Sequence, residues 1–349
     1  MNNLLNLYFA THDTCNMNCR YCYIPREKRT QPKYSDEDIL FSLNEFLQKA
    51  ERENILIGTF CFHGTEPSLM SADTLAEGVQ MVNEFRRDSG SPNKRTSIQT
   101  NGLNFTDEYL DELEVVRNNL LISFSIDPPK DVHDFYRADS YDQIYSNYLN
   151  CIDRGFAVSA LSVVSKNTLA HLDDFAIWMK TELMRQEHIC NPQKVKIKFA
   201  TGDDSLDDED FREFGYFLLD NDLAGIAQLF TPGYCIHHGN ECSWYEFDIN
   251  GNCYSCNKNY MPDGIFANWQ KEPFSKIISK REKLFRKYPE HKECAACKYE
   301  YLCNSGCPAD RIKSGINKGK SHECVLIKTV YDTVQKKGAH IVDFFNGND

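Results

Sequence analysis

The chain has 349 residues, of which 41% are apolar, so it can bury a large core and hold more than one domain. Its net charge of -12 argues against a protein that tracks nucleic-acid phosphates or binds an anionic membrane surface. No apolar run approaches the roughly 20 residues of a membrane helix, and residues 1–13 lack the features of a signal peptide. The fifteen cysteines are therefore expected in a reducing compartment, the cytoplasm, as metal ligands rather than disulfides.

Strand-like and helix-like stretches alternate over the first 200 residues. We predict six strands, at 4–10, 55–62, 96–100, 120–126, 158–164 and 195–200. Helical patterns lie between them at 35–52, 72–87, 106–117, 141–154 and 170–185, and Ser35 with Asp38 resembles a capping box. Such repeats specify parallel strands joined by right-handed crossovers. Six of them predict a partial, TIM-like barrel that binds its ligands at the carboxyl ends of the strands.

The cysteines divide the chain unevenly. Three lie at 15–22 and nine lie between 235 and 324. We predict an α/β protein with a partial (β/α)6 barrel over 1–200, a bridging segment over 201–230, and a small cysteine-rich domain with a C-terminal helix over 231–349. The acidic run at 202–210 is consistent with either a linker or a solvated loop.

Residues 14–23 read TCNMNCRYCY and place Cys15, Cys19 and Cys22 directly after the first predicted strand. Three thiolates can hold three corners of a [4Fe–4S] cube and leave the fourth iron open to a ligand. Tyr21 supplies a ring beside whatever binds there. A three-thiolate zinc site completed by His12 is the alternative.

This pattern resembles the radical S-adenosylmethionine superfamily, whose signature is C-x3-C-x-aromatic-C after the first strand. The resemblance implies that the amine and carboxylate of S-adenosylmethionine chelate the open iron. It also implies that an electron from the cluster cleaves the sulfonium and releases a 5′-deoxyadenosyl radical.

Four further segments match the family in order, each at or after the end of a predicted strand: HGTEP (63–67), QTNG (99–102), SFSID (123–127) and VVSKN (163–167). Together with HDFYR (133–137), the resemblance assigns Gly64, Thr65 and Glu66 to the methionine amine, Asn101, Ser125 and Asp127 to the ribose, Arg137 to the cofactor carboxylate and Val164 to the adenine. Thr65 and Pro128 depart from the usual glycines. Taken alone, Arg137 fits a solvated surface charge and Glu66 a helix N-terminal acid, whereas their shared order favours the cofactor roles. His63 and Cys61 are interpreted as packing residues.

The C-terminal cysteines resemble the SPASM extension of that superfamily, with Cys235-x15-Gly251-x4-Cys256, then Cys294-x2-Cys297-x5-Cys303-x3-Cys307, then Cys324. The resemblance implies two auxiliary [4Fe–4S] clusters, for three in all. By position, one is ligated by Cys235, Cys242, Cys256 and Cys307, and the other by Cys294, Cys297, Cys303 and Cys324. Cys253 competes with Cys242 for the eighth position, and two zinc sites are the alternative for the whole array.

Eight thiolates would leave no open corner on either auxiliary cluster, so these clusters could only pass electrons, which favours an oxidative reaction. Enzymes resembling this chain cross-link ribosomally made precursor peptides or oxidise a sulfatase cysteine or serine to formylglycine. The second class carries an aspartate base after the cysteine matching Cys256, and here that residue is Asn257. We therefore predict an oxidoreductase that abstracts a side-chain hydrogen from a precursor peptide and forms a carbon–carbon link of the cyclophane type to an aromatic side chain, or a thioether. A sulfatase maturase and a zinc-binding adaptor are the alternatives.

The predicted partners are the precursor peptide and an electron donor such as flavodoxin or ferredoxin. Many peptide maturases bind a leader peptide through a small domain ahead of the barrel. Because the first predicted strand starts at about residue 4, we expect recognition by the barrel, by residues 201–230 or by a separate protein.

Overall fold

A computed structural model describes residues 3–30, 34–92, 94–187, 195–225, 228–230, 235–314 and 320–346. The chain forms two compact units, and each is built from several segments. Unit 1 comprises Met1–Ser125, Arg137–Ser159 and Ser243–Lys283; unit 2 comprises Ile126–Tyr136, Ala160–Cys242 and Leu284–Asp349. No helix in the described ranges is long and apolar enough to cross a membrane.

Unit 1 is built on a sheet whose strands run in the order β4-β3-β2-β1-β7-β8-β9. Its strands are β1 (Leu4–His12), β2 (Leu56–Gly64), β3 (Thr96–Thr100), β4 (Leu120–Ser125), β7 (Trp244–Asp248), β8 (Asn252–Tyr254) and β9 (Ile265–Asn268). The pairs from β1 to β4 are parallel, and β7 lies parallel to the other edge of β1. Strands β8 and β9 continue the sheet as antiparallel neighbours. Consequently β1 is an interior strand.

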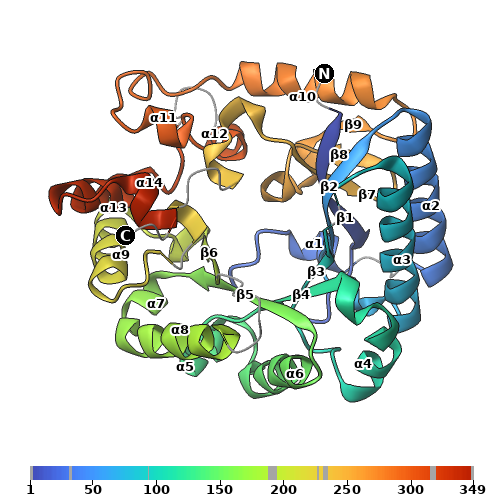
Figure 1. Ribbon diagram of the computed structural model, residues 1–349, viewed down its shortest axis with the longest axis horizontal. Helices are drawn as coiled ribbons and strands as arrows, with labels where there is room; N and C mark the ends of the chain where they lie inside the picture. The colour runs from blue at the N-terminus through green and yellow to red at the C-terminus, as the bar shows by residue number, and fades with distance from the viewer. Residues whose placement is uncertain are drawn as a thin grey trace. The chain divides into compact units, whose positions relative to one another are not determined.

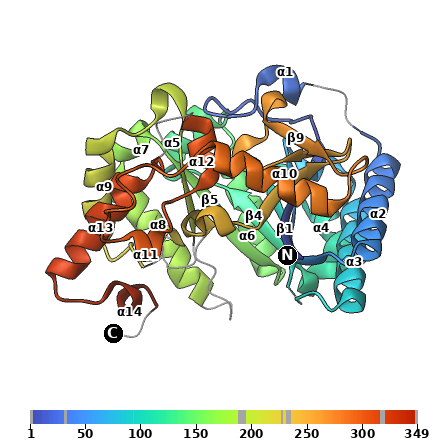
Figure 2. The ribbon, with the colours of Figure 1, turned by 90° about the horizontal axis from the view of Figure 1, so that it is seen from above.

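Helices cover one face of the unit 1 sheet (Figure 1). They are α2 (Asp36–Arg52), α3 (Ala72–Ser89), α4 (Asp107–Leu113), α6 (Tyr141–Asp153) and the first turns of α10 (Phe274–Lys287). The short helix α1 (Arg26–Arg29) lies apart from this layer (Figures 1 and 2). The ring of Phe46 on α2 lies 5.7 Å from Phe9 on β1 and 5.8 Å from Phe247 on β7. Gly78 on α3 packs against Phe62 on β2. These apolar side chains, all buried, fix which face of each strand meets the helices.

Unit 2 contains β6 (Lys196–Phe199), which pairs in parallel with the carboxyl half of β5 (Ala157–Val164). Its helices are α5 (Lys130–Tyr136), α7 (Lys166–Leu169), α8 (Leu172–Glu187), α9 (Asp208–Asp220), α11 (Glu300–Cys303), α12 (Pro308–Ser314), α13 (Cys324–Lys336) and α14 (Ile341–Asn346). Helices α9 and α13 lie side by side, with Gly215 against Leu326 and Thr329 (Figures 1 and 2).

The predicted α/β class with parallel strands is confirmed, and all six predicted strands are present. The capping box is also present, since Ser35 and Asp38 bond reciprocally at the start of α2. Two differences stand out. Helix α5 has no counterpart among the predicted elements. The acidic run at 202–210 was predicted as a linker or a solvated loop, whereas its last residues form the start of α9 (Asp208–Asp220). Asp207 caps α9, whose buried face includes Phe211 and Phe214, so the acidic residues form the first turn of a packed helix.

Candidate functional site

The three-cysteine loop follows β1 in unit 1 and closes on itself through backbone contacts. The amide of Cys15 donates to the carbonyl of Arg29 at 3.1 Å, and the amide of Cys22 donates to the carbonyl of Cys19 at 3.3 Å. Thr14 and Thr30 form an isolated antiparallel bridge. All three thiols are half-buried, so they line an accessible site.

Two of the predicted cofactor residues direct N–H groups at sulfurs of this loop. The amide nitrogen Nδ2 of Asn101, after β3, lies 3.9 Å from Cys15 Sγ. A guanidinium nitrogen of Arg137, after α5, lies 3.8 Å from Cys19 Sγ. The same guanidinium sits over the ring of Tyr21, 5.4 Å from its centroid. The structure therefore brings Asn101, Arg137 and Tyr21 together around the thiols.

The HGTEP segment turns sharply against the end of β1. Gly64 has a φ of +113°, and a Cβ there would lie 2.9 Å from the carbonyl oxygen of His12, so glycine is required. The hydroxyl of Thr65 donates to the carbonyl of His12 at 3.0 Å and also bonds the carbonyl of Thr14. The residue that departs from the family glycine thus ties the end of β2 to the base of the three-cysteine loop.

Glu66 is almost fully buried at the junction of β2 and β3. Its carboxylate accepts bonds from the amide and hydroxyl of Ser68, the hydroxyl of Thr100 and the amide of Asn101. Burial raises the pKa of this carboxyl, and the four donors oppose that rise. Glu66 consequently fixes the backbone that carries Asn101, in addition to any contact with a bound amine.

The remaining predicted cofactor residues lie at strand ends. Ser125 ends β4, and its hydroxyl accepts a bond from Gln99 at 3.0 Å. Asp127 belongs to unit 2, is fully buried, and accepts the backbone amide of Val163 at 2.8 Å. The carbonyl of Val164 accepts the amide of Ala200. Their predicted contacts with ribose and adenine stay predictions.

The three thiols of the cysteine loop are suited to bind an iron–sulfur core, which carries positive charge. Burial, followed by the nearby charge of Glu66, raises the pKa of the Cys15 thiol to about 12. A thiolate at this position therefore needs an adjacent positive charge, which iron would supply. The N–H groups of Asn101 and Arg137 lie where they could bond cluster or cysteine sulfur, as partners of metal-bound sulfur commonly do.

A second group of thiols lines a cavity in unit 2. Its walls contain four cysteines, Cys294, Cys297, Cys303 and Cys324, together with Lys320 and Lys328. Burial raises the pKa of Cys303 to about 12 and also raises that of Cys324, and the neighbouring cysteines add to the shift of each. Four half-buried thiols around one cavity fit a cube with all four corners ligated.

The other predicted auxiliary ligands are divided between the units. Cys235, Cys242 and Cys307 belong to unit 2 and Cys256 to unit 1. Within unit 2, the segment 235–242 is bonded to the segment 304–311. Asn304 donates to the carbonyl of His237 at 2.7 Å, and Arg311 donates to Asn240 at 2.6 Å. This first ligand set stays a prediction.

Arg311 carries a buried charge beside these cysteines. Its side chain is 1% exposed, and Glu290 lies 3.7 Å from Nη1. Among the described residues Nε has no hydrogen-bond partner. Burial lowers the pKa of the guanidinium, whereas Glu290, Cys307 and Cys294 favour its charged form. A buried cation of this kind fits a neighbouring anionic cluster. Within the described ranges no three His, Cys, Asp or Glu side chains converge on a single metal ion.

Two residues bear on the choice of ligands and base. Cys253 is fully buried, and its thiol lies 3.6 Å from the carbonyl of Gly251. The thiol of Cys256 donates to the side-chain oxygen of Asn257 at 3.0 Å. Asn257 therefore contacts Cys256 and offers no carboxylate.

One buried pair was missed by the sequence analysis. His63 Nδ1 lies 3.0 Å from one carboxylate oxygen of Glu246. The Glu246 side chain is fully buried, and among the described residues its other oxygen has no hydrogen-bond partner. The alternation of apolar residues around Phe62 on β2 and Phe247 on β7 could have placed both side chains on the same face. The signal is weak because the two residues are 183 positions apart and their strands meet only as the two neighbours of β1.

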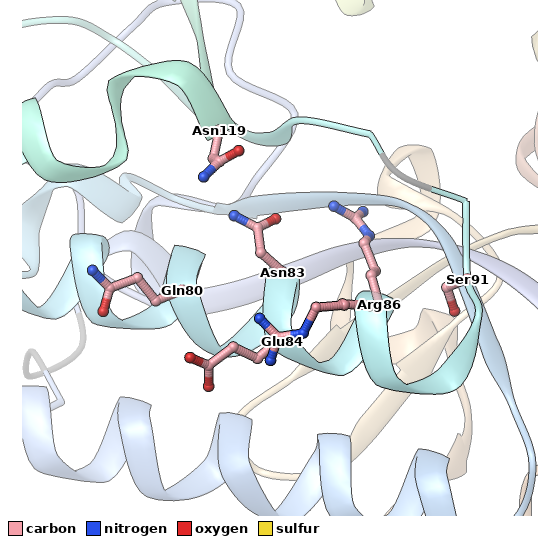
Figure 3. Close-up of a pocket in the computed structure, with 7 residues that line it drawn as sticks. Gln80, Asn83, Glu84, Arg86, Ser91 and Asn119 are labelled. Carbon is pink, nitrogen blue, oxygen red and sulfur yellow. The ribbon is translucent and has the colours of Figure 1, made fainter.

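A separate cavity of 440 Å³ lies beside α3, at the end of the helix that precedes β3 (Figure 3). Gln80, Asn83, Glu84 and Arg86 line it from the helix, with Ser91 and Asn119 beyond. Arg86 is 2% exposed and donates to the carbonyls of Gly58 and Lys94. Its guanidinium therefore holds the amino-terminal ends of strands together, away from the cysteine loop at the carboxyl end of β1.

Residues 10–179 match the family described as the Radical SAM superfamily, and the match spans the cysteine loop and all the predicted cofactor positions. This chain is a radical SAM enzyme. Membership implies one [4Fe–4S] cluster and S-adenosylmethionine as its cofactors, and the predicted family and enzyme class are confirmed.

This radical SAM enzyme is similar in sequence to a sulfatase-maturating enzyme and similar in fold to two solved structures that contain a peptide. It is 24% identical over 334 residues to a cysteine-type anaerobic sulfatase-maturating enzyme of Clostridium novyi, covering 88% of each chain. Its fold matches the solved structure titled native anSMEcpe with bound AdoMet and Cp18Cys peptide, with a TM-score of 0.75, 19% identity, and coverage of 99% and 100% of the two chains. It also matches Streptococcus suis SuiB bound to precursor peptide SuiA, with a TM-score of 0.63, 11% identity, and coverage of 93% and 76%.

Proposed function

We propose that this enzyme is a peptide maturase that removes a side-chain hydrogen from a ribosomally made precursor and closes an oxidative carbon–carbon cross-link to an aromatic side chain. The observation that carries the proposal is the contrast between a three-thiol loop with two N–H donors at its sulfurs and a cavity walled by four thiols. The first arrangement suits a cluster with an open iron, and the second suits a cluster that only transfers electrons.

The chain's own residues have definable tasks in this reaction. Cys15, Cys19 and Cys22 would hold the cofactor-binding cluster, which supplies the electron that splits S-adenosylmethionine. Arg137 would bind the cofactor carboxylate, a task suited to a guanidinium. Gly64 would let the backbone approach the methionine amine, because no Cβ fills that space. Ser125 and Asp127 at the ribose and Val164 at the adenine would orient the nucleoside.

Two auxiliary clusters belong to the same proposal. Cys294, Cys297, Cys303 and Cys324 would hold one in the unit 2 cavity. Cys235, Cys242, Cys256 and Cys307 would hold the other. The cross-link removes two hydrogens from the peptide, one as an atom and one as a proton, so one electron must leave the peptide adduct. Fully ligated clusters would accept that electron and could pass it to a flavodoxin or ferredoxin.

A peptide substrate is supported by the fold matches. Both solved structures named above contain a peptide, Cp18Cys in one and the precursor SuiA in the other. The sulfatase-maturating relatives favour a second candidate, the oxidation of a cysteine or serine to formylglycine. Asn257 speaks against that candidate because an amide cannot accept a proton as a carboxylate does.

Anaerobic incubation with dithionite, S-adenosylmethionine and candidate peptides tests the two reactions by mass spectrometry. A peptide that loses two hydrogens and keeps its sulfur supports the cross-link. Conversion of a sulfatase cysteine to formylglycine, with no cross-linked product from precursor peptides, would replace the first proposal with the second. Iron and sulfide analysis of the same protein provides the composition. Three cubane clusters correspond to about twelve irons per chain, whereas bound zinc without iron would reject both reactions in favour of an adaptor.

A further inference from the structure

The unit 1 sheet carries a polar pair on the face opposite its helices, here called the inner face. Phe9, Phe62 and Phe247 point to α2 and α3, as their packing shows. Side chains alternate along a strand, so Tyr8, His63 and Glu246, their immediate neighbours, point to the inner face. Tyr8 is in register with Glu246 on β7, and Ala10 is in register with His63 on β2.

The contact between the two side chains defines their hydrogen bonding. His63 Nδ1–H donates to Glu246 Oε1 at 3.0 Å. With Nδ1 protonated in this way, the other ring nitrogen, Nε2, carries the lone pair. The imidazole is further held by the ring of Tyr8, whose centroid lies 4.9 Å away, and Tyr8 in turn stacks on Trp244 at 4.7 Å.

The buried carboxylate orients the imidazole. Glu246 is 0% exposed, and among the described residues its second oxygen, Oε2, has no hydrogen-bond partner. The bond from Nδ1–H to Oε1 therefore fixes the ring and leaves the lone pair of Nε2 available to accept a proton.

The pair lies next to the cysteine loop. His63 directly precedes the Gly64–Glu66 turn, and Thr65 in that turn is bonded to the base of the loop. Ala10, which is in register with His63, belongs to a buried cluster against which Cys22 and Tyr23 pack. The strand position of His63 therefore adjoins the end of the cysteine loop.

We propose that His63 is the proton acceptor of the cross-linking reaction and that Glu246 positions its imidazole. This inference rests on the proposed function. One substrate hydrogen leaves as an atom, taken by the deoxyadenosyl radical, and the resulting carbon radical bonds to a carbon of the aromatic ring. To restore the ring, that carbon must lose a proton and the adduct one electron. His63 Nε2 takes the proton, and the cluster that Cys294, Cys297, Cys303 and Cys324 would hold would accept the electron.

The position of Asn257 strengthens this assignment. The side-chain oxygen of Asn257 accepts the thiol of Cys256, and an amide cannot take up a proton as a carboxylate does. A reaction that releases a proton in this site therefore needs another acceptor. The inner face supplies an imidazole with an oriented second nitrogen.

The first test compares His63→Gln with the wild-type holoenzyme on a precursor peptide. We expect 5′-deoxyadenosine formation within about twofold of wild type and cross-linked product reduced on the order of 100-fold, the usual contribution of a general base. His171→Gln, ahead of α8 in unit 2, is the matched control and should change neither quantity. Wild-type yield of product from His63→Gln would overturn the proposal, as would equal loss of deoxyadenosine and product.

The second test separates a base from a packing residue. In His63→Ala, added imidazole should restore product formation in proportion to its concentration, while a packing role predicts no rescue. In Glu246→Gln, the loss of the ring hydrogen should become slower, so a peptide deuterated at that ring position should show a larger isotope effect on product formation than with wild type. No rescue together with an unchanged isotope effect would overturn the inference. If wild type itself forms no cross-link from any precursor, the proposed function fails instead, and the two failures are thereby distinguished.

Discussion

The two groups of thiols differ in what surrounds them, and the difference defines their tasks. The loop after β1 has three thiols, and side chains from two other segments direct N–H groups at Cys15 and Cys19. The unit 2 cavity has four thiols, and its other lining residues come from the same stretch of chain, 293–328. A site assembled from distant segments can bind and orient a molecule, whereas a self-contained set of four thiols suffices to hold a cluster. We propose that this contrast between three and four thiols corresponds to a contrast between chemistry and electron transfer.

The largest effect is expected from the three-cysteine loop. Cys19→Ala should reduce reductive formation of 5′-deoxyadenosine to the background of enzyme-free controls, because two thiolates cannot hold the cofactor-binding cluster. The measurement is deoxyadenosine by chromatography after anaerobic reduction. Cys151→Ala, a fully buried cysteine in α6, is the matched control and should keep activity. Normal deoxyadenosine from Cys19→Ala would reject the assignment of the loop.

Removal of a thiol from the four-cysteine cavity should separate the two halves of the reaction. Cys303→Ala should lose about four irons per chain, retain part of the deoxyadenosine formation and yield no cross-linked peptide. The readouts are iron content and mass spectrometry of the same reaction. Normal product yield from the iron-depleted variant would show that the unit 2 thiols are structural, and the proposed difference between the two groups would then be wrong.

A smaller effect is expected from the cation beside Cys19. Arg137→Ala should weaken S-adenosylmethionine binding on the order of 10- to 100-fold, the loss that corresponds to one charge-assisted hydrogen bond. Equilibrium binding to the reconstituted enzyme measures it. Arg137→Lys keeps the charge without the planar fork and should fall between the two. Equal affinity of wild type and both variants for S-adenosylmethionine would show that Arg137 does not bind the cofactor.

The smallest effect concerns the tie between β2 and the loop. Thr65→Val removes the hydroxyl that bonds the carbonyls of His12 and Thr14. The free energy of unfolding should fall by about 1 kcal/mol, and the Tm should fall by about 2 °C. Thr65→Gly should cost more, since it also frees the backbone. An unchanged Tm in both variants would show that the loop is held by its own backbone bonds alone.

Much of the fold followed from local patterns. The six parallel strands were predicted to within two residues at most of their ends, because each is an apolar run bounded by turn signals and followed by a helical repeat. Helix α5 was missed because its seven residues, KDVHDFY, hold a single set of apolar residues at helical spacing, Val132, Phe135 and Tyr136, which is too short to distinguish a helix from a loop. The acidic start of α9 was underestimated because charge dominates a segment whose apolar stripe begins only at Phe211.

The site was predicted unevenly, for physical reasons. Spacing alone identifies Cys15, Cys19 and Cys22, because ligands of one cluster lie close in sequence. Arg137 and Asn101 required the resemblance to a family, since nothing in their neighbours marks them. His63 and Glu246 could not be paired from sequence, because their contact depends on β7 returning to lie beside β1 after more than 230 residues. In the sequence, Thr65 was noticed only because it replaces the family glycine. The hydrogen bonds of its hydroxyl to His12 and Thr14 could not be inferred without the structure of the Gly64–Glu66 turn.

The parallel placement of β7 against β1 has a consequence for dissection of the chain. An open sheet exposes a row of unsatisfied amides and carbonyls along its first strand, which invites pairing with another molecule. Residues 244–248 occupy that border, so the carboxyl-terminal third of the polypeptide shields the amino-terminal third. A fragment ending ahead of Ser243 would uncover the border of the strand from which the three thiols emerge. Soluble expression of the amino-terminal region should accordingly require the β7–β8 hairpin as well.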